Sequence, residues 1–201
     1  MTKEGVFFDN HVEFVKHFLK GQIAMEDVRR ELMAQAAKME KTGLPLTHVD
    51  SHQHMHMLPG VIDISLDVAA SLHLDAVRIS RTPLFTAFAG MGQLIGRLGL
   101  FTLSELSLWK AKRRHFRVPD HFDGIVAGEA VHEGHFLHIL KDLRPGTTEV
   151  MMHPGTDNEK LIPACDWEHD FEAEMQAIVS PKVRRMIADK AVKVVNYRDL
   201  K

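Results

Sequence analysis

The stretch from Leu46 to His56 reads Leu-Thr-His-Val-Asp-Ser-His-Gln-His-Met-His and holds four of the chain's fourteen histidines. We call it the histidine tract. Alternate residues of an extended backbone point to the same side. Five polar residues of the tract share this alternation: His48, Asp50, His52, His54 and His56. Imidazoles and a carboxylate crowded in this way suit Zn²⁺, Mn²⁺, Ni²⁺ or Fe²⁺, so the tract predicts a metal site. Asp50 is then either a ligand or a partner that orients a ligating imidazole.

The position of the histidine tract also favours a site. A short apolar strand signal, Leu46 and Val49, leads into it, and Pro59-Gly60 and a helical pattern follow. The tract therefore lies at the carboxyl end of a predicted strand, where α/β folds place their binding sites. A solvated histidine-rich turn is the alternative interpretation, because such tracts also arise from compositional bias.

Length and composition indicate one well-buried domain. The chain has 201 residues, of which 45% are hydrophobic, enough for a single core but short for two. A net charge of −2 shows no excess of positive charge of the kind that binds nucleic acid. One cysteine, Cys165, excludes an internal disulfide and fits a reducing compartment. The first residues lack the apolar core of a signal peptide, so we expect a cytoplasmic protein.

Helical and strand patterns alternate along the chain. Hydrophobic spacing predicts helices over residues 11–19, 25–41, 61–72, 134–143, 167–178 and 181–190. Short apolar runs predict strands near residues 46–49, 76–79, 124–127, 147–152 and 192–195. This alternation is typical of parallel βα units, and it indicates an α/β fold.

The segment 84–109 is long and apolar, but several glycines and Arg97 interrupt it. A bilayer span needs about 20 predominantly apolar residues in one run, so the segment is not predicted to cross a membrane. A mobile helical lid, a surface for an apolar substrate and a plain core helix are the three interpretations that its sequence leaves open.

Two further residues follow strand signals and suggest chemistry. His153 follows the run 147–152, and an imidazole with a pKa of about 6.5 can protonate a leaving amine near neutral pH. A capping or packing role is its alternative. Arg78 could orient a carboxylate or bind a substrate oxygen, and a surface ion pair is its alternative. His132, His135 and His138 lie on a polar face and are expected to be solvated.

Four segments together resemble a known family, the YdjC-like carbohydrate deacetylases. They are Thr47-His-Val-Asp-Ser-His-Gln-His-Met-His56, Ala76-Val-Arg-Ile79, Glu149-Val-Met-Met-His-Pro154 and Tyr197-Arg-Asp-Leu200. The family includes chito-oligosaccharide deacetylases and hopanoid-biosynthesis-associated deacetylases. Phe116-Arg-Val-Pro-Asp120 and the turn Arg144-Pro-Gly-Thr-Thr-Glu149 look closer to the hopanoid-associated branch.

The resemblance implies a distorted TIM-like (β/α) barrel and hydrolysis of an N-acetyl group from an amino sugar with a divalent metal ion, Mg²⁺ or Zn²⁺. It implies His52 as a metal ligand and His153 as the catalytic acid. We assign Asp50 to catalysis beside His153, and Arg78, His54 and His56 to substrate binding.

The chain departs from the family pattern at its beginning. The family's opening Asn-Ala-Asp-Asp-Phe-Gly strand, which supplies a base and a metal ligand, has no counterpart, and neither has its Gly-x-His segment. We therefore expect residues 1–201 to form the carboxyl-terminal part of a single YdjC-like deacetylase domain, with a barrel that lacks its first strands. The alternative function is a catalytically silent remnant with a structural or weak metal-binding role.

The expected partners follow from the same resemblance. A small carbohydrate or a glycolipid is the expected substrate, and no nucleic acid is expected. Peripheral membrane contact and a homodimer are left open.

Overall fold

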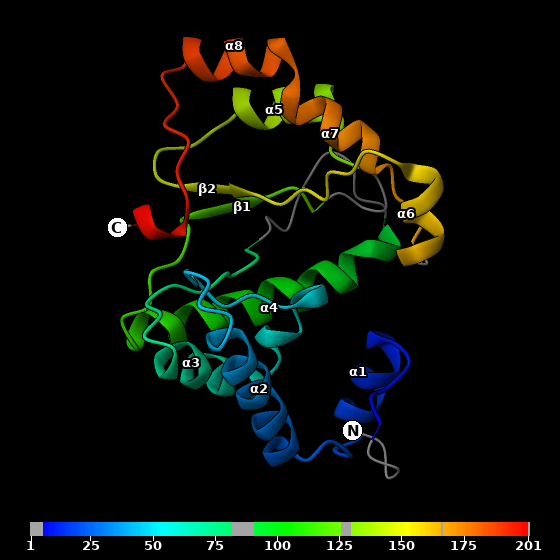
Figure 1. Ribbon diagram of the computed structural model, residues 1–201, viewed down its shortest axis with the longest axis vertical. Coiled ribbons are helices and arrows are strands. Elements are labelled where there is room, and N and C mark those ends of the chain that lie inside the picture. The colour runs from blue at the N-terminus through cyan, green and yellow to red at the C-terminus, as the bar shows by residue number, and fades with distance from the viewer. Residues whose placement is uncertain (1–5, 82–90, 126–129, 166, 201) are drawn as a thin grey trace. The chain divides into compact units, whose positions relative to one another are not determined.

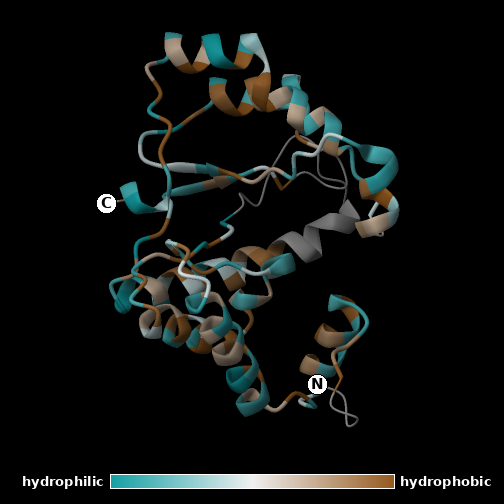
Figure 2. Cartoon of the chain, viewed as in Figure 1, coloured by the Kyte–Doolittle hydropathy of each residue, from teal (hydrophilic) through white to brown (hydrophobic). Residues whose placement is uncertain are grey.

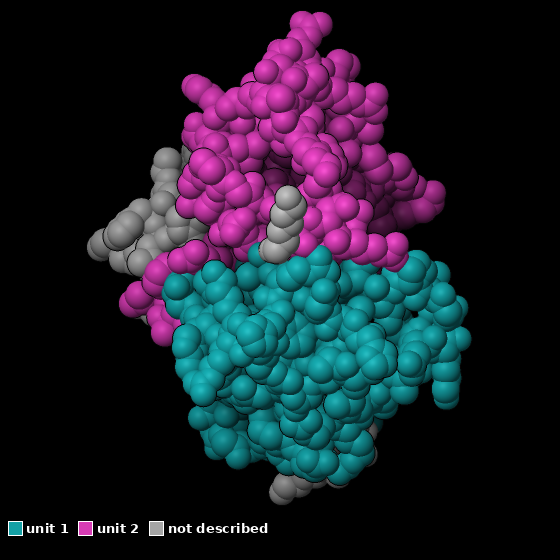
Figure 3. All heavy atoms as spheres, turned by 90° about the vertical axis from the view of Figure 1, so that its left-hand side faces the viewer, with its two compact units in different colours: residues 1–79, 103–118, 201 teal, residues 80–102, 119–200 magenta. Residues whose placement is uncertain are grey.

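The structure is a computed structural model that describes residues 6–81, 91–125, 130–165 and 167–200, with backbone alone for residues 91–97. The chain divides into two compact units (Figure 3). Unit 1 comprises residues 1–79, 103–118 and 201, and unit 2 comprises residues 80–102 and 119–200. Compact units of this kind also occur within one domain, so the single domain stays a prediction.

Helices α2 and α3 form the core of unit 1 (Figure 1). The helices of this unit are α1 (His11–Leu19), α2 (Met25–Glu40), α3 (Val61–Ser71) and the later part of α4 (Met91–Arg113). Ala36, Ile64 and Val68 are buried where α2 and α3 pack, because apolar residues recur at helical spacing on both helices. The helices predicted over residues 11–19, 25–41 and 61–72 are therefore confirmed.

Strand pairing in unit 1 is parallel and very short. Val49 pairs with Val77, and Ala76 pairs with Arg117, as isolated bridges. Val77 is completely buried. Its N–H donates to the carbonyl oxygen of Arg117 over 3.1 Å. The strand signals near residues 46–49 and 76–79 thus mark the right places, although each strand is reduced to one or two paired residues.

Among its described residues, unit 2 contains a two-stranded parallel sheet, the first part of α4 and four complete helices. Strand β1 (His121–Asp123) pairs with β2 (Thr148–Val150), with Phe122 opposite Glu149. The helices are α5 (Glu133–Lys141), α6 (Asn158–Cys165), α7 (Phe171–Val179) and α8 (Pro181–Asp189), and Tyr197–Asp199 form a 3₁₀ turn, η2. Helix α5 packs on both α7 and α8, and Figure 2 shows that it is mainly hydrophobic.

The sequence-based predictions for unit 2 are partly confirmed. Helices α5, α7 and α8 and strand β2 lie where the patterns place them, whereas α6 was not expected because Pro163 interrupts it. The strand predicted over residues 192–195 is wrong, since Val194 is 75% exposed and this segment has no strand pairing. Residues 126–127 of the strand predicted over residues 124–127 lie outside the described residues.

The described residues thus form a mixed α/β structure in which helices dominate and a small parallel sheet is present. A TIM-like barrel stays an expectation from the family resemblance. In the part of the chain that the structure describes, no helix combines the length and hydropathy that a membrane span requires.

Gly124 allows the two strands of unit 2 to continue side by side. Its φ of +96° is unfavourable for other residues, and an added Cβ would press against the backbone oxygen and nitrogen of Met151. We expect Gly124→Ala to lower the free energy of unfolding by about 2–4 kcal/mol. Gly134→Ala is the matched control in α5, where nothing lies within 4 Å, and it should be neutral or stabilise by up to about 1 kcal/mol. Urea denaturation measures both, and equal effects would contradict this account.

Candidate functional site

The histidine tract is extended only as far as Ser51. Residues His52–Met57 then form a 3₁₀ turn, η1, in which Gln53 and His54 have φ of 51° and 57°. The prediction that every second side chain from His48 to His56 lies on one side is therefore wrong beyond Ser51, because an extended backbone is required for that alternation. His52 is exposed, His54 is half-buried and His56 is buried.

His56 is held inside the chain by both ring nitrogens. Its side chain is 2% exposed. Nε2 lies 2.7 Å from the carbonyl oxygen of Arg78, and Nδ1 lies 2.7 Å from the Ser51 hydroxyl. Because a carbonyl only accepts, Nε2 carries the hydrogen and Nδ1 accepts from Ser51. His56 thus closes the turn and ties it to the neighbouring strand; its substrate-binding role stays a prediction.

Asp50 and Arg78 form an ion pair beside this turn. The parallel bridge between Val49 and Val77 places the two residues next to each other, and a guanidinium nitrogen of Arg78 donates to the Asp50 carboxylate. Both side chains are largely covered. The ion pair agrees both with an Arg78 that orients a carboxylate and with the plain ion pair considered as its alternative, and the substrate-binding role of Arg78 stays a prediction.

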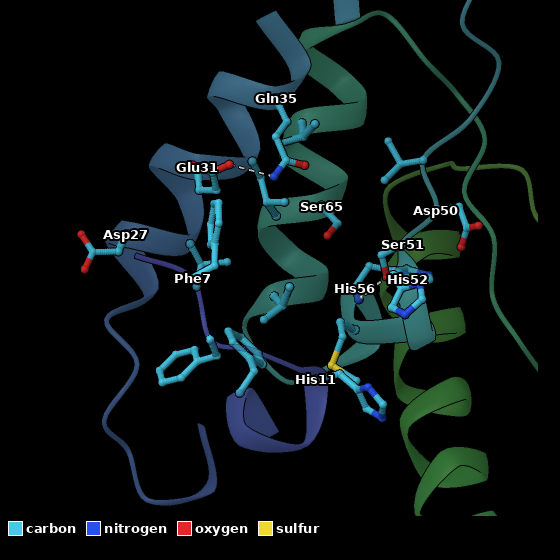
Figure 4. Close-up of a pocket in the computed structure, with 18 of the residues that line it drawn as sticks. Phe7, His11, Asp27, Glu31, Gln35, Asp50, Ser51, His52, His56 and Ser65 are labelled. Atoms are coloured by element: carbon cyan, nitrogen blue, oxygen red, sulfur yellow. Dashed lines mark hydrogen bonds between the residues drawn. The ribbon is translucent and has the colours of Figure 1, made fainter. Parts of the chain in front are cut away.

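A cavity of about 450 Å³ lies beside the histidine tract in unit 1 (Figure 4). Asp50, Ser51, His52 and His56 lie together at one end of it, and α2 contributes polar residues on the other side. The α2 residues are Asp27, Glu31 and Gln35. Most of the remaining lining is apolar, apart from Asn10, His11 and Ser65, and it comprises Phe7, Phe8, Phe14, Val28, Leu32, Val49, Met55, Val61 and Val68. An apolar cavity of this size with a few polar groups is typical of a small-molecule site.

The described residues of the histidine tract do not gather three metal ligands around one point. Among the residues that the structure describes, such a group occurs in unit 2, where ligand atoms of His153, His169 and Glu174 all lie within 4.8 Å of one another. His52 has the ring of His11 as a neighbour, with ring centroids 6.4 Å apart. His52 as a metal ligand stays a prediction, and sequence analysis missed both His169 and Glu174.

Glu174 is the centre of this group. Its side chain, on α7, is 1% exposed, and the two carboxylate oxygens accept the backbone N–H groups of Val131, over 2.9 Å, and of His153. Oε1 also lies 3.3 Å from Nε2 of His169. One buried carboxylate therefore positions His153, three residues after β2, and Val131, two residues before α5.

Aromatic rings enclose the two histidines. Trp167 stacks on His169 with ring centroids 4.1 Å apart, and it meets His153 edge-on at 5.0 Å. Phe171 contacts both Trp167 and His169. Since Trp167 is 40% exposed, the cluster lies close to the surface of unit 2.

Asp123, at the end of β1, has a perturbed carboxyl group. Partial burial raises its pKa above the ordinary value of 3.8, and the nearby positive charge of Arg144, followed by His121, His135 and His138, opposes this shift. A strand-end carboxyl group with a raised pKa is a functional candidate that the sequence did not reveal. The signal was weak because His121 and Asp123 come before the strand that the hydropathy pattern predicted.

Comparison with known proteins identifies the family. The family model described as YdjC-like protein matches residues 1–189. The chain belongs to the YdjC-like family. Within curated proteins, a carbohydrate deacetylase from Mus musculus is 28% identical over 225 residues, which cover 100% of this chain and 70% of that protein.

Two bacterial relatives agree with this membership of the YdjC-like family. A carbohydrate deacetylase from Thermoanaerobacter pseudethanolicus is 27% identical over 177 residues, which cover 88% of this chain and 61% of that protein. A chitooligosaccharide deacetylase from Yersinia enterocolitica is 26% identical over 183 residues, which cover 89% of this chain and 63% of that protein. The chain thus spans less than two thirds of the length of both bacterial relatives, and the resemblance read from the sequence motifs is confirmed.

Removing the Glu174 carboxylate should destabilise this YdjC-like chain strongly. Glu174→Ala leaves two backbone N–H groups without their acceptor, at about 1–3 kcal/mol each, so we expect a loss of about 2–6 kcal/mol. Glu172→Ala is the control on the same helix, because the Glu172 carboxylate accepts one exposed N–H, of Asn158. Its loss should stay within about 1 kcal/mol. Chemical denaturation followed by circular dichroism measures both, and similar losses would show that Glu174 does not anchor the backbone.

Asp123 should make stability depend on pH. A raised pKa in the folded state means that folding favours the protonated acid, so the stability that this group contributes is present below its ordinary pKa and falls as pH rises through the folded value. We expect Asp123→Asn, a neutral mimic, to be more stable than the parent near pH 7 and equal to it near pH 3. Urea midpoints across this range test the sign. A variant that is less stable at neutral pH would contradict it.

Proposed function

We propose that this chain is a carbohydrate deacetylase that hydrolyses the N-acetyl group of an amino sugar. Membership of the YdjC-like family and the names of its deacetylase relatives support the proposal. The observation that carries it is the cavity of unit 1, where Asp50, Ser51 and His52 lie at one end of a largely apolar space of about 450 Å³, which suits a small sugar.

The reaction adds water to the acetamide carbonyl carbon, breaks the C–N bond and releases acetate and an amine. We propose that it depends on a divalent metal ion, Mg²⁺ or Zn²⁺, with His52 as one ligand. Such an ion, when bound, polarises a carbonyl and lowers the pKa of water. The described part of the tract does not by itself complete a three-ligand set, so the further ligands are not assigned.

The chain's own side chains have separate roles in this proposal. Asp50 takes the proton of the attacking water, and the Arg78 guanidinium holds the Asp50 carboxylate in place. His153 gives a proton to the leaving amine. His54 and His56 line or support the substrate-binding end of the tract, where His56 fixes the turn through Ser51 and Arg78.

The substrate is either a chito-oligosaccharide or a glycolipid of the hopanoid-linked type. The Yersinia enterocolitica relative is named for the first class. The apolar segment 84–109 motivates the second, but its residues 84–90 lie outside the described residues. Leu98, within α4, is exposed and keeps an apolar side chain available for lipid.

Activity should depend on the histidine tract and on metal. We expect amine release from N-acetylglucosamine oligomers to fall by about 10²-fold or more in Asp50→Asn and His52→Ala, because a positioned base contributes about 10²–10⁴-fold. His132→Ala is the control, since His132 is exposed at the start of α5. Dialysis against a chelator should abolish turnover, and added Mg²⁺ or Zn²⁺ should restore it.

Two outcomes would overturn the proposal. Full activity in both tract variants would show that catalysis does not use this end of the cavity. No amine release from any acetylated sugar, with either metal and with folded protein, would favour a silent chain that has only a structural or weak metal-binding role.

A further inference from the structure

We propose that unit 2 carries its own site for a zinc-like transition-metal ion, formed by His153, His169 and Glu174. These residues offer two imidazole nitrogens and one carboxylate oxygen within 4.8 Å of one another. Two nitrogens and one oxygen are a ligand set that suits Zn²⁺, with a fourth position left for water. The histidine tract belongs to unit 1, whereas these three residues belong to unit 2.

The contact between His169 and Glu174 favours an ion over a direct hydrogen bond. His169 is 8% exposed, and its buried Nε2 has no hydrogen-bond partner. The same nitrogen lies 3.3 Å from Oε1 of Glu174. Two ligand atoms on one tetrahedral Zn²⁺, each at about 2.0–2.2 Å from the metal, are about 3.3–3.6 Å apart. The separation therefore fits one edge of a coordination tetrahedron, and a bound ion would satisfy the nitrogen that is otherwise without a partner.

The surrounding residues hold the ligands in orientation. Each carboxylate oxygen of Glu174 accepts one backbone N–H, from Val131 or His153, and an oxygen with two lone pairs retains one for a metal. Trp167 stacks on the His169 ring and limits its rotation. Hydrogen bonds and packing behind the ligands typically strengthen a metal site. The exposed edge of Trp167 places the cluster within reach of ions in solution.

The ligand types also select the ion. Imidazole suits Zn²⁺, Co²⁺, Ni²⁺ and Cu²⁺, whereas Mg²⁺ prefers an all-oxygen set and keeps its waters. An imidazole nitrogen bound to an ion cannot also deliver a proton to an amine. Zn²⁺ beyond the amount that restores turnover would therefore inhibit the hydrolysis once it fills this site, whereas excess Mg²⁺ would not; this consequence rests on the proposed function, whereas the binding itself does not.

Trp167 provides a direct readout of binding. The chain has two tryptophans, and Trp109→Phe leaves Trp167 as the single tryptophan, in contact with two of the proposed ligands, so that its fluorescence can be excited selectively at the red edge of tryptophan absorption. Titration of this full-length variant with Co²⁺ should quench its fluorescence and produce the visible absorption of a four-coordinate ion. Addition of Zn²⁺ should reverse both signals by displacement.

Matched variants in the Trp109→Phe background test the ligands. His169→Gln and His153→Gln should each raise the Co²⁺ midpoint about tenfold or more. His132→Gln, in the same unit, and His52→Ala, in the histidine tract, should leave it within about twofold, because neither residue is a ligand of this site. Circular dichroism checks that each variant is folded. If the variant of the buried His169 does not fold, the Co²⁺ midpoint of His153→Gln tests the site.

Unchanged quenching in folded His153→Gln and His169→Gln would overturn the proposal, as would loss of quenching in His52→Ala. Since these measurements contain no sugar, a failure of the deacetylase proposal leaves the binding result intact. Conversely, deacetylase activity without Co²⁺ binding at Trp167 would refute this site alone.

Discussion

Short parallel strands leave backbone groups unpaired, and buried side chains must satisfy them. In unit 2 the sheet has two strands of three residues each, and the Glu174 carboxylate accepts the N–H groups of Val131 and His153 beyond them. In unit 1 the strand pairing consists of isolated bridges, and the His56 ring donates to the carbonyl of Arg78. An unpaired buried N–H or C=O is costly, so these two side chains support the folding of the segments around them.

The side chains that anchor the backbone, His56 and Glu174, also lie next to the candidate functional residues. His56 closes the turn that exposes His52 toward the cavity, and Arg78, whose carbonyl His56 holds, also carries the ion pair to Asp50. Glu174 fixes the backbone of His153 and lies against the ring of His169. Residues that anchor the backbone therefore decide where the reactive groups lie, and a substitution at an anchor acts on stability and on the site together.

The two histidine clusters differ in the role that a metal ion would have. The histidine tract lines an apolar cavity and offers exposed His52, which is the arrangement expected where a substrate must approach an ion. The cluster in unit 2 is enclosed by Trp167 and Phe171, and its ligands are oriented by buried hydrogen bonds. Tight enclosure favours affinity for an ion over turnover of a large substrate. The family match covers both clusters, because it spans residues 1–189.

Local pattern in the sequence determined most elements of this protein. Apolar spacing predicted α1, α2 and α3, the strand signals located Val49 and Val77, and the motifs around His52 and His153 identified the family. These features depend on residues within a few positions of one another, which a sequence displays directly. The turn after Ser51 was not predicted, because it depends on hydrogen bonds that His56 makes to Ser51 and to Arg78, 22 residues away.

Only the tertiary structure brought His153, His169 and Glu174 together. The three residues come from the loop after β2, the loop before α7 and α7 itself, and nothing in their spacing relates them. Glu174 in particular has the sequence context of an ordinary charged residue on a helix, yet it is buried because two distant backbone N–H groups require an acceptor. Periodicity reports which face of an element is apolar, whereas the partners of a buried polar group are decided by how the chain packs.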